Sequence, residues 1–379
     1  SILILIPQTG ITVKKSTRTE RDRQIVGMRE SVYNKILYHP PKFLPCYGVG
    51  KYEEDPFCIL NDVLCCAFDA PQPSCYLLIY CHANSTDLGK CKSHLKFISI
   101  ALNMHVIGVE YPGYGPMKGK PSEKNLNNAV SKVFKYVTQT LGWPEQQIIV
   151  LGRSIGSGPA LQLATNADLG GIVLVSAFKS IKEVAKDRFP KLVRVLPVTK
   201  SWNNIECIKL VKCPVLLVHG ALDRIVLPSH SLALLKAITH AQKGLSTLEQ
   251  RGHNKLNWSP IIREMGAFML KFIISDGLSP NPLNIEDPCF QRARELIRRF
   301  QDLQDNKKSC RQKITKPCQS PVASKRKEKG WKKKTTHMPT PASALPDKKS
   351  VEKKGVPTGG VDKVQDRQEE KSADFPQFG

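Results

Sequence analysis

Three residues of the types that make an activated serine nucleophile occur in order along the chain: Ser154, Asp223 and His253. Ser154 lies in the stretch Gly152-Arg153-Ser154-Ile155-Gly156, with a glycine two residues away on each side. A serine hydroxyl is a weak nucleophile unless a base takes its proton, and the base needs a third group to orient it. These residue types therefore predict acyl transfer, with Ser154 as nucleophile, His253 as base and Asp223 as the orienting acid.

Short buried strands are predicted in front of all three residues. Runs rich in branched apolar residues are typical of strands that are buried on both faces of a parallel sheet. Such runs occupy residues 75–83, 105–112, 147–152, 171–177 and 213–220, and "LSTLEQ" (245–250) is a further strand candidate. Between them lie stretches with helical spacing of apolar residues, such as 126–142. Strands and helices in alternation predict an α/β fold with a mostly parallel central sheet and helices on both faces.

The surroundings of Ser154 are those of a nucleophile elbow. "IIVL" is a predicted strand, Gly152–Gly156 a tight turn and "GPALQLA" the start of a helix, an arrangement typical of α/β-hydrolases. In that fold the acid and the histidine follow the serine in this order. Taken alone, Asp223 could be a turn or helix-capping carboxylate and His253 a surface histidine. Their order and context favour the catalytic interpretation.

An oxyanion hole is expected next to the serine. One donor is predicted to be the backbone N–H of Ile155, directly after the nucleophile, and the other to come from the loop after an earlier strand. In "CYLLIYCHANSTDLG" this second donor is assigned to the N–H of Ala83, and His82 is interpreted as structural. Glu110 and Tyr111 are expected to line the pocket.

Five ordered blocks carry a resemblance to a known family: "HANSTDLG", "MHVIGVEYPGYG", "GRSIGSGPA", "HGALDRIV" and "GHNKL". The chain resembles the α/β-hydrolase domain-containing protein 17 subfamily over about residues 38–274. The resemblance implies a serine hydrolase that removes palmitate from the cysteines of membrane-attached proteins, with Ser154, Asp223 and His253 in the roles given above. Ala83 stands where the family usually has glycine. Residues 1–36 contain no cysteine, whereas subfamily members carry an acylated N-terminal cysteine cluster.

Charge and composition divide the 379 residues into four parts. We expect an N-terminal extension over 1–36, the hydrolase domain with a small cap over 37–287, an amphipathic helix over 288–305 and a disordered Lys-rich tail over 306–379. The net charge is +24, and from residue 291 onward 23 Lys and Arg stand against 11 Asp and Glu. Residues 306–379 contain few large apolar residues, and such a segment cannot bury enough surface to fold.

Cofactors and metals are not expected. The 12 cysteines show no C-x-x-C pair of the kind that zinc sites use, and they are interpreted as free thiols of a reducing compartment. No apolar run reaches the about 20 residues that span a bilayer. We therefore expect a cytoplasmic protein, with peripheral attachment to the cytosolic face of membranes and a nuclear location both left open.

Substrate and partners remain open at this stage. The expected substrate is an acylated protein or a lipid-like ester, and a general carboxylesterase, a lipase or a serine peptidase would use the same residues. A non-catalytic scaffold is the alternative from another class, with its basic tail bound to acidic partners. The run "KRKEKGWKKK" (325–334) could serve as a nucleic-acid arm or a nuclear localisation patch, although a solvated tail explains it equally well. The oligomeric state is not predicted.

Overall fold

The computed structural model describes residues 34, 37–41, 47, 56–188, 202–254, 256–275 and 277–315. The side chains of Phe300 and of residues 304–315 lie outside this description. Eight strands form one sheet: β1 (Phe57–Leu60), β2 (Val63–Phe68), β3 (Leu77–Cys81), β4 (His105–Val109), β5 (Ile148–Arg153), β6 (Gly171–Val175), β7 (Val215–Gly220) and β8 (Lys243–Leu248). The principal helices are α2 (Leu88–Leu102), α3 (Glu123–Lys135), α4 (Ser157–Ala164), α5 (Ile181–Arg188), α7 (Asn204–Cys207), α8 (Ser229–Ala237), α9 (Trp258–Phe272) and α10 (Asp287–Thr315).

The sheet is mostly parallel, as expected. Its strand order is β1-β2-β4-β3-β5-β6-β7-β8. Strands β3 to β8 pair in parallel, whereas β2 pairs antiparallel with both β1 and β4. Because parallel strands end at the same edge, the loops after β3, β5, β7 and β8 are brought together. These are the loops that contain Ala83, Ser154, Asp223 and His253.

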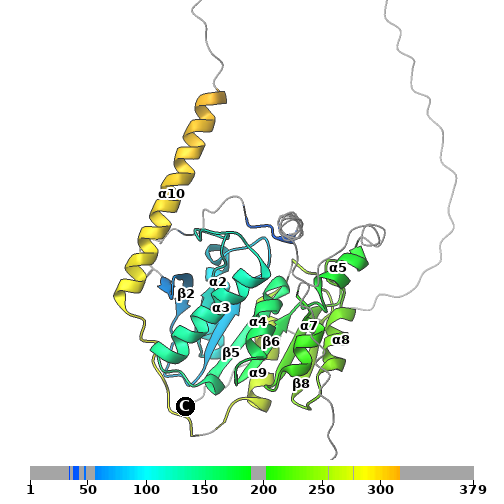
Figure 1. Cartoon of the computed structure of the whole chain (residues 1–379). Coiled ribbons are helices and arrows are strands. Elements are labelled where there is room, and N and C mark those ends of the chain that lie inside the picture. The colour runs from blue at the N-terminus through cyan, green and yellow to red at the C-terminus, as the bar shows by residue number, and fades with distance from the viewer. Residues whose placement is uncertain are drawn as a thin grey trace, which may run out of the picture. The chain divides into compact units, whose positions relative to one another are not determined.

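Helices cover both faces of the sheet, which confirms the predicted layers. In the view of Figure 1, α3 and α4 lie in front of the sheet. Their apolar residues share one core with α8, and among them are Val130, Leu161 and Leu234. A second core on the other face contains residues of α2 and α9, such as Leu95 and Met265. The strands read as continuous apolar runs because both of their faces are buried.

Two helices differ from their expected boundaries. The helix expected over 126–142 is α3 followed by a π-helical turn, Tyr136–Thr140. The helix expected over 288–305 is α10, which continues to Thr315, into the segment where we expected the tail to begin. Its buried residues Ala293 and Ile297 pack on the sheet side, and Arg292 donates a 2.9 Å hydrogen bond to the Asp62 carboxylate.

Several predicted segments lie outside the described residues. These are most of the N-terminal extension, residues 189–201 within the expected cap segment (178–212), and residues 316–379 of the tail. The division of the chain into four parts therefore stays a prediction. Within the described residues, no cysteine forms a disulfide bond.

Candidate active site

Ser154 occupies a strained corner between β5 and α4. Strand β5 ends at Arg153, a single 3₁₀ turn spans Ser154–Gly156, and α4 begins at Ser157. The φ angle of Ser154 is +53°, a left-handed conformation that residues with a Cβ atom rarely adopt. Ser157 fastens the turn, because its hydroxyl donates a 2.6 Å hydrogen bond to the Ser154 carbonyl oxygen. The sequence thus builds the predicted elbow.

The two glycines of the elbow are required by close backbone contacts. A Cβ atom on Gly152 would lie 2.5 Å from the Gly156 carbonyl oxygen. A Cβ atom on Gly156 would lie 2.2 Å from the carbonyl oxygen of Cys81, at the end of β3, and 2.7 Å from that of His82. These distances are far below van der Waals contact. The glycines therefore let the elbow press directly against the loop that carries Ala83.

The three predicted catalytic side chains meet in one hydrogen-bonded relay. The Ser154 Oγ atom lies 3.0 Å from His253 Nε2, and His253 Nδ1 lies 2.7 Å from Asp223 Oδ2. A carboxylate oxygen accepts, so the ring proton belongs on Nδ1. The Nε2 lone pair then faces the serine hydroxyl. This is the geometry that a general base needs in order to take the Ser154 proton.

Asp223 is fixed at the other end of the relay by its own loop. Its Oδ1 atom accepts hydrogen bonds from the backbone N–H groups of Ile225 and Val226, each at 2.9 Å. Burial alone would raise the pKa of Asp223. Hydrogen bonds from His219 and His253 outweigh burial and hold that pKa well below its usual range. The carboxylate therefore stays ionised while it orients the His253 ring.

Arg153 connects the elbow to the histidine loop. Its guanidinium group donates a 3.1 Å hydrogen bond to the backbone carbonyl oxygen of His253. The two residues are 100 positions apart in the sequence, and no local sequence pattern indicates this contact of Arg153. This bond holds the backbone of the base at a fixed distance from the residue directly before the nucleophile.

The loop after β3 brings Ala83 to the elbow. Ala83 is almost fully buried, and its φ angle is not among the positive ones, so its methyl group fits without strain where the family usually has glycine. Asn84 anchors the loop: its side chain donates to the Leu37 carbonyl oxygen at 2.8 Å and accepts from the Tyr114 hydroxyl at 2.7 Å. Farther along, Asp87 caps α2 by accepting from the Lys90 N–H at 2.9 Å.

Glu110 lies behind this loop and does not line an open pocket. Both Glu110 and Tyr111 have no exposed surface, which corrects the expectation that they face a substrate. The Glu110 carboxylate accepts hydrogen bonds from the Tyr47 hydroxyl and, at 2.9 Å, from the Leu88 N–H. His82 Nε2 lies 2.8 Å from the same carboxylate. His82 is thus structural, as expected, and it belongs to a buried polar network under the Ala83 loop.

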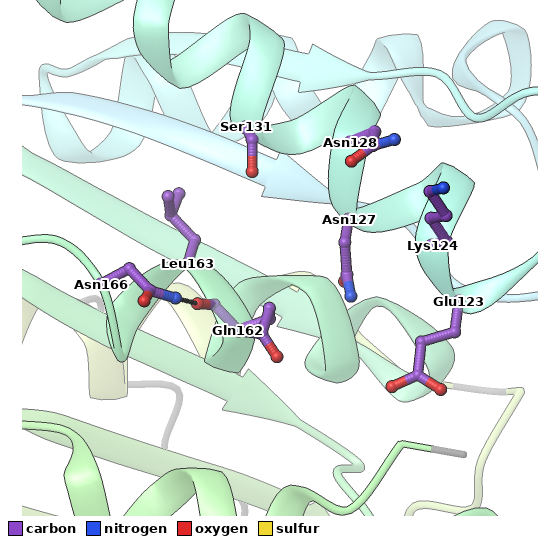
Figure 2. A pocket seen from close by; sticks show the side chains of 8 residues that line it. All are labelled: Glu123, Lys124, Asn127, Asn128, Ser131, Gln162, Leu163 and Asn166. Atoms are coloured by element: carbon purple, nitrogen blue, oxygen red, sulfur yellow. Dashed lines mark hydrogen bonds between the residues drawn. The ribbon is translucent and has the colours of Figure 1, made fainter. Parts of the chain in front are cut away.

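A polar cavity lies elsewhere on the molecule, between α3 and α4. Its volume is about 550 Å³. Figure 2 shows its lining, which is Glu123, Lys124, Asn127, Asn128, Ser131, Gln162, Leu163 and Asn166. The cavity lies beside the C-terminal half of α4, whereas Ser154 precedes the N-terminal end of that helix. Amide and charged side chains do not suit an acyl chain, so this cavity does not extend the candidate active site.

The described residues contain no group of three or more His, Cys, Asp or Glu side chains arranged to hold a metal ion. None of the helices that the structure describes is both long enough and apolar enough to cross a bilayer.

Part of the sheet and the elbow match a known family. Residues 89–215 match a family described as "Alpha/beta hydrolase of unknown function (DUF1057)". The matched region contains β4, β5, the elbow and β6. The chain has the α/β-hydrolase fold. Its sheet order, its elbow and this match agree, and they confirm the fold class predicted from the sequence.

Curated relatives of this chain confirm the resemblance noted in the sequence. The chain is 36% identical over 175 residues to "Alpha/beta hydrolase domain-containing protein aho-3" of Caenorhabditis elegans. This match covers 45% of the chain and 50% of that protein. The chain is 31% identical to protein 17B of Xenopus laevis and 32% identical to protein 17C of Homo sapiens, covering 50% of this chain and 65% and 57% of those proteins. The chain thus spans between half and two thirds of the length of these relatives.

Solved structures with a similar backbone are more distant in sequence. An esterase of Pyrococcus furiosus, Pf2001, has a TM-score of 0.49 and 14% identity over 62% of this chain and 98% of the esterase. A monoacylglycerol lipase of Paleococcus ferrophilus has a TM-score of 0.43 and 17% identity over 55% of this chain and 98% of the lipase. Identities this low say nothing about the substrate of this chain.

Proposed function

We propose that this chain is a serine hydrolase that works by two-step acyl transfer. The observation that carries the proposal is the relay Ser154–His253–Asp223, with distances of 3.0 and 2.7 Å, on a serine at positive φ. A serine that only packs in a core has no need of a histidine and a buried carboxylate in line with it. A purely non-catalytic scaffold would not need this arrangement either.

The first step forms an acyl-enzyme. Ser154 Oγ attacks the carbonyl carbon of the substrate while His253 Nε2 takes its proton, and Asp223 stabilises the imidazolium that results. The negative charge on the carbonyl oxygen is stabilised by the N–H groups of Ile155 and Ala83; one such donor is typically worth about 3 kcal/mol. The imidazolium then gives its proton to the leaving thiolate or alkoxide.

The second step releases the acyl group. Water attacks the acyl-serine ester, His253 takes a proton from that water, and the tetrahedral intermediate collapses to the free acid and Ser154. Asp223 keeps the ring oriented throughout, because the depressed pKa of its carboxyl leaves it ionised. All proton transfers in both steps pass through one histidine nitrogen, and no step uses a cofactor.

As substrate we propose a long-chain acyl thioester on a protein cysteine. This assignment follows from the resemblance to the α/β-hydrolase domain-containing protein 17 subfamily, supported by the similarity to the 17B and 17C relatives. The basic body of the chain would favour an anionic membrane, where acylated proteins are anchored, at about 1 kcal/mol for each well-placed Lys or Arg.

Hydrolysis assays on matched substrates test the substrate assignment. We expect the protein to release palmitate from an S-palmitoyl cysteine peptide faster than from the O-palmitoyl serine peptide of the same sequence, and Ser154→Ala to release none. Faster hydrolysis of short oxyesters would instead indicate a general esterase. Cleavage of the peptide bonds themselves would indicate a peptidase, and either result would overturn the thioesterase assignment while leaving the serine mechanism in place.

A further inference from the structure

The peptide bond between His82 and Ala83 carries the donor that we assign to the oxyanion hole. A peptide unit is planar and trans, so its C=O and N–H groups point in opposite directions. Whatever holds the His82 carbonyl oxygen therefore also sets the direction of the Ala83 N–H. That N–H makes no hydrogen bond to any residue in the described part of the chain, which leaves it available to a substrate oxygen.

The His82 carbonyl oxygen is held by Tyr111. The Tyr111 hydroxyl donates a hydrogen bond to it at 3.0 Å. We propose that Tyr111 is a positioning residue of the oxyanion hole: its hydroxyl fixes the peptide whose N–H stabilises the negative charge of the transition state. This inference rests on the proposed serine hydrolase function, and Tyr111 itself does not touch the substrate.

Tyr111 is rigid enough for this role. Its ring is fully buried and packs against the His82 ring, with centroids 4.0 Å apart and the planes tilted by 34°, and it meets the Tyr114 ring edge-on at 5.6 Å. Burial raises the pKa of the Tyr111 hydroxyl well above its ordinary value. The hydroxyl therefore keeps its proton and remains a donor at neutral pH.

Two further contacts restrict the same stretch of backbone. His82 Nδ1 lies 2.9 Å from the Ala83 carbonyl oxygen, and Nε2 of the same ring lies 2.8 Å from the Glu110 carboxylate. From the elbow side, Gly156 approaches so closely that a Cβ atom on it would lie 2.7 Å from the His82 carbonyl oxygen. The Tyr111 hydroxyl thus holds the peptide unit before Ala83, and the His82 ring contacts the carbonyl oxygen of the peptide unit after it.

Deleting the hydroxyl alone tests the proposal. Tyr111→Phe keeps the ring and its packing against His82 but removes the hydrogen bond to the His82 carbonyl oxygen. Tyr76→Phe is the matched control, since the hydroxyl of that nearly buried tyrosine also donates to a backbone carbonyl, that of Ile273, at 3.2 Å. Tyr76 precedes β3, at the end of the strand opposite to the loop with Ala83.

The two variants are compared by steady-state kinetics on a short p-nitrophenyl ester and by inhibition with an aliphatic trifluoromethyl ketone. The serine adduct of this ketone carries an oxyanion, so its Ki reports the oxyanion hole directly. Loss of a whole donor lowers kcat by about 100- to 1000-fold, and a misdirected donor should cost part of that, about 10- to 100-fold. For Tyr111→Phe we expect this loss in kcat, little change in KM, and a rise in Ki matching the fall in kcat/KM.

The control separates positioning from stability. Tyr111→Phe loses the bond to the His82 carbonyl oxygen, whereas Tyr76→Phe loses its bond to the Ile273 carbonyl oxygen and also the bond that its hydroxyl accepts from the Ser275 N–H. The melting temperature of Tyr76→Phe should therefore fall at least as much as that of Tyr111→Phe, while Tyr76→Phe keeps its kcat and Ki. The proposal is overturned if Tyr111→Phe keeps kcat as well, or if it loses kcat with an unchanged Ki. Failure of the wild type to hydrolyse the ester or to bind the ketone would instead overturn the proposed function.

Discussion

Replacing Ser154 by glycine and by alanine separates the strain of the elbow from the loss of the hydroxyl. Both variants remove the hydrogen bond to His253 Nε2. Only the alanine variant keeps a Cβ atom at a φ of +53°. If the backbone of the elbow is strained by this Cβ atom, the glycine variant should be the more stable of the two inactive proteins.

The size of the difference follows from two opposing terms. A Cβ atom in the left-handed conformation costs about 1–2 kcal/mol. Glycine loses about 0.5–1 kcal/mol more backbone entropy on folding than alanine does. At the midpoints of the two ranges the strain is the larger, so we expect Ser154→Gly to exceed Ser154→Ala in free energy of unfolding by about 0.75 kcal/mol.

Urea denaturation measures this difference, provided that the two variants share one m-value. Ser85 is a positive control, because it is exposed and has a φ of +58°, so glycine should again be favoured over alanine. Ser131 within α3 is the opposite control, where alanine should be favoured by about 1 kcal/mol. The reasoning is refuted if alanine is as stable as glycine at position 154 while both controls behave as expected.

Three further predictions follow from contacts around the site. Gly156→Ala should abolish activity and lower the melting temperature, because the new Cβ atom would lie 2.2 Å from the Cys81 carbonyl oxygen; an active, equally stable variant would contradict this. Burial and the Arg153 charge lower the pKa of His94 from 6.5 to about 3. Only the unfolded ring then takes up a proton at pH 5, which costs the folded state about 2 kcal/mol relative to pH 8. His94→Phe should lose that much less stability on acidification, and an identical pH dependence would count against it. Arg153→Met should lower kcat about 10-fold at constant KM, by freeing the backbone of His253; unchanged kinetics would exclude this role.

Much of the fold could be predicted because its strands are buried on both faces. The runs at 105–112, 147–152 and 171–177 contain β4, β5 and β6 almost residue for residue. The hairpin of β1 and β2 was missed, although Asn61-Asp62 in "CILNDVLCCAF" carries its signal. Both residues have positive φ, as a two-residue hairpin turn requires, and apolar runs flank them.

Only part of the candidate site could be predicted, because local sequence patterns reveal some of its residues and not the contacts between distant ones. Ser154, Asp223 and His253 could be placed because each follows a strand that the local pattern reveals. The buried network could not be predicted, because no local pattern pairs His82 with a glutamate 28 positions away. This network consists of Glu110, His82 and Tyr111. The available signal was Glu110, a charged residue directly after an apolar strand. Such a residue is explained better by a buried hydrogen-bond partner than by a place in a pocket lining.

The central claim is that Ser154 is activated by His253 and Asp223. Intact-mass spectrometry after incubation with a fluorophosphonate probe tests it most directly. We expect one covalent adduct, located on Ser154 by peptide mapping, absent from Ser154→Ala and formed far more slowly in His253→Gln. A folded wild-type protein that forms no adduct, or one labelled equally fast without His253, would contradict the claim.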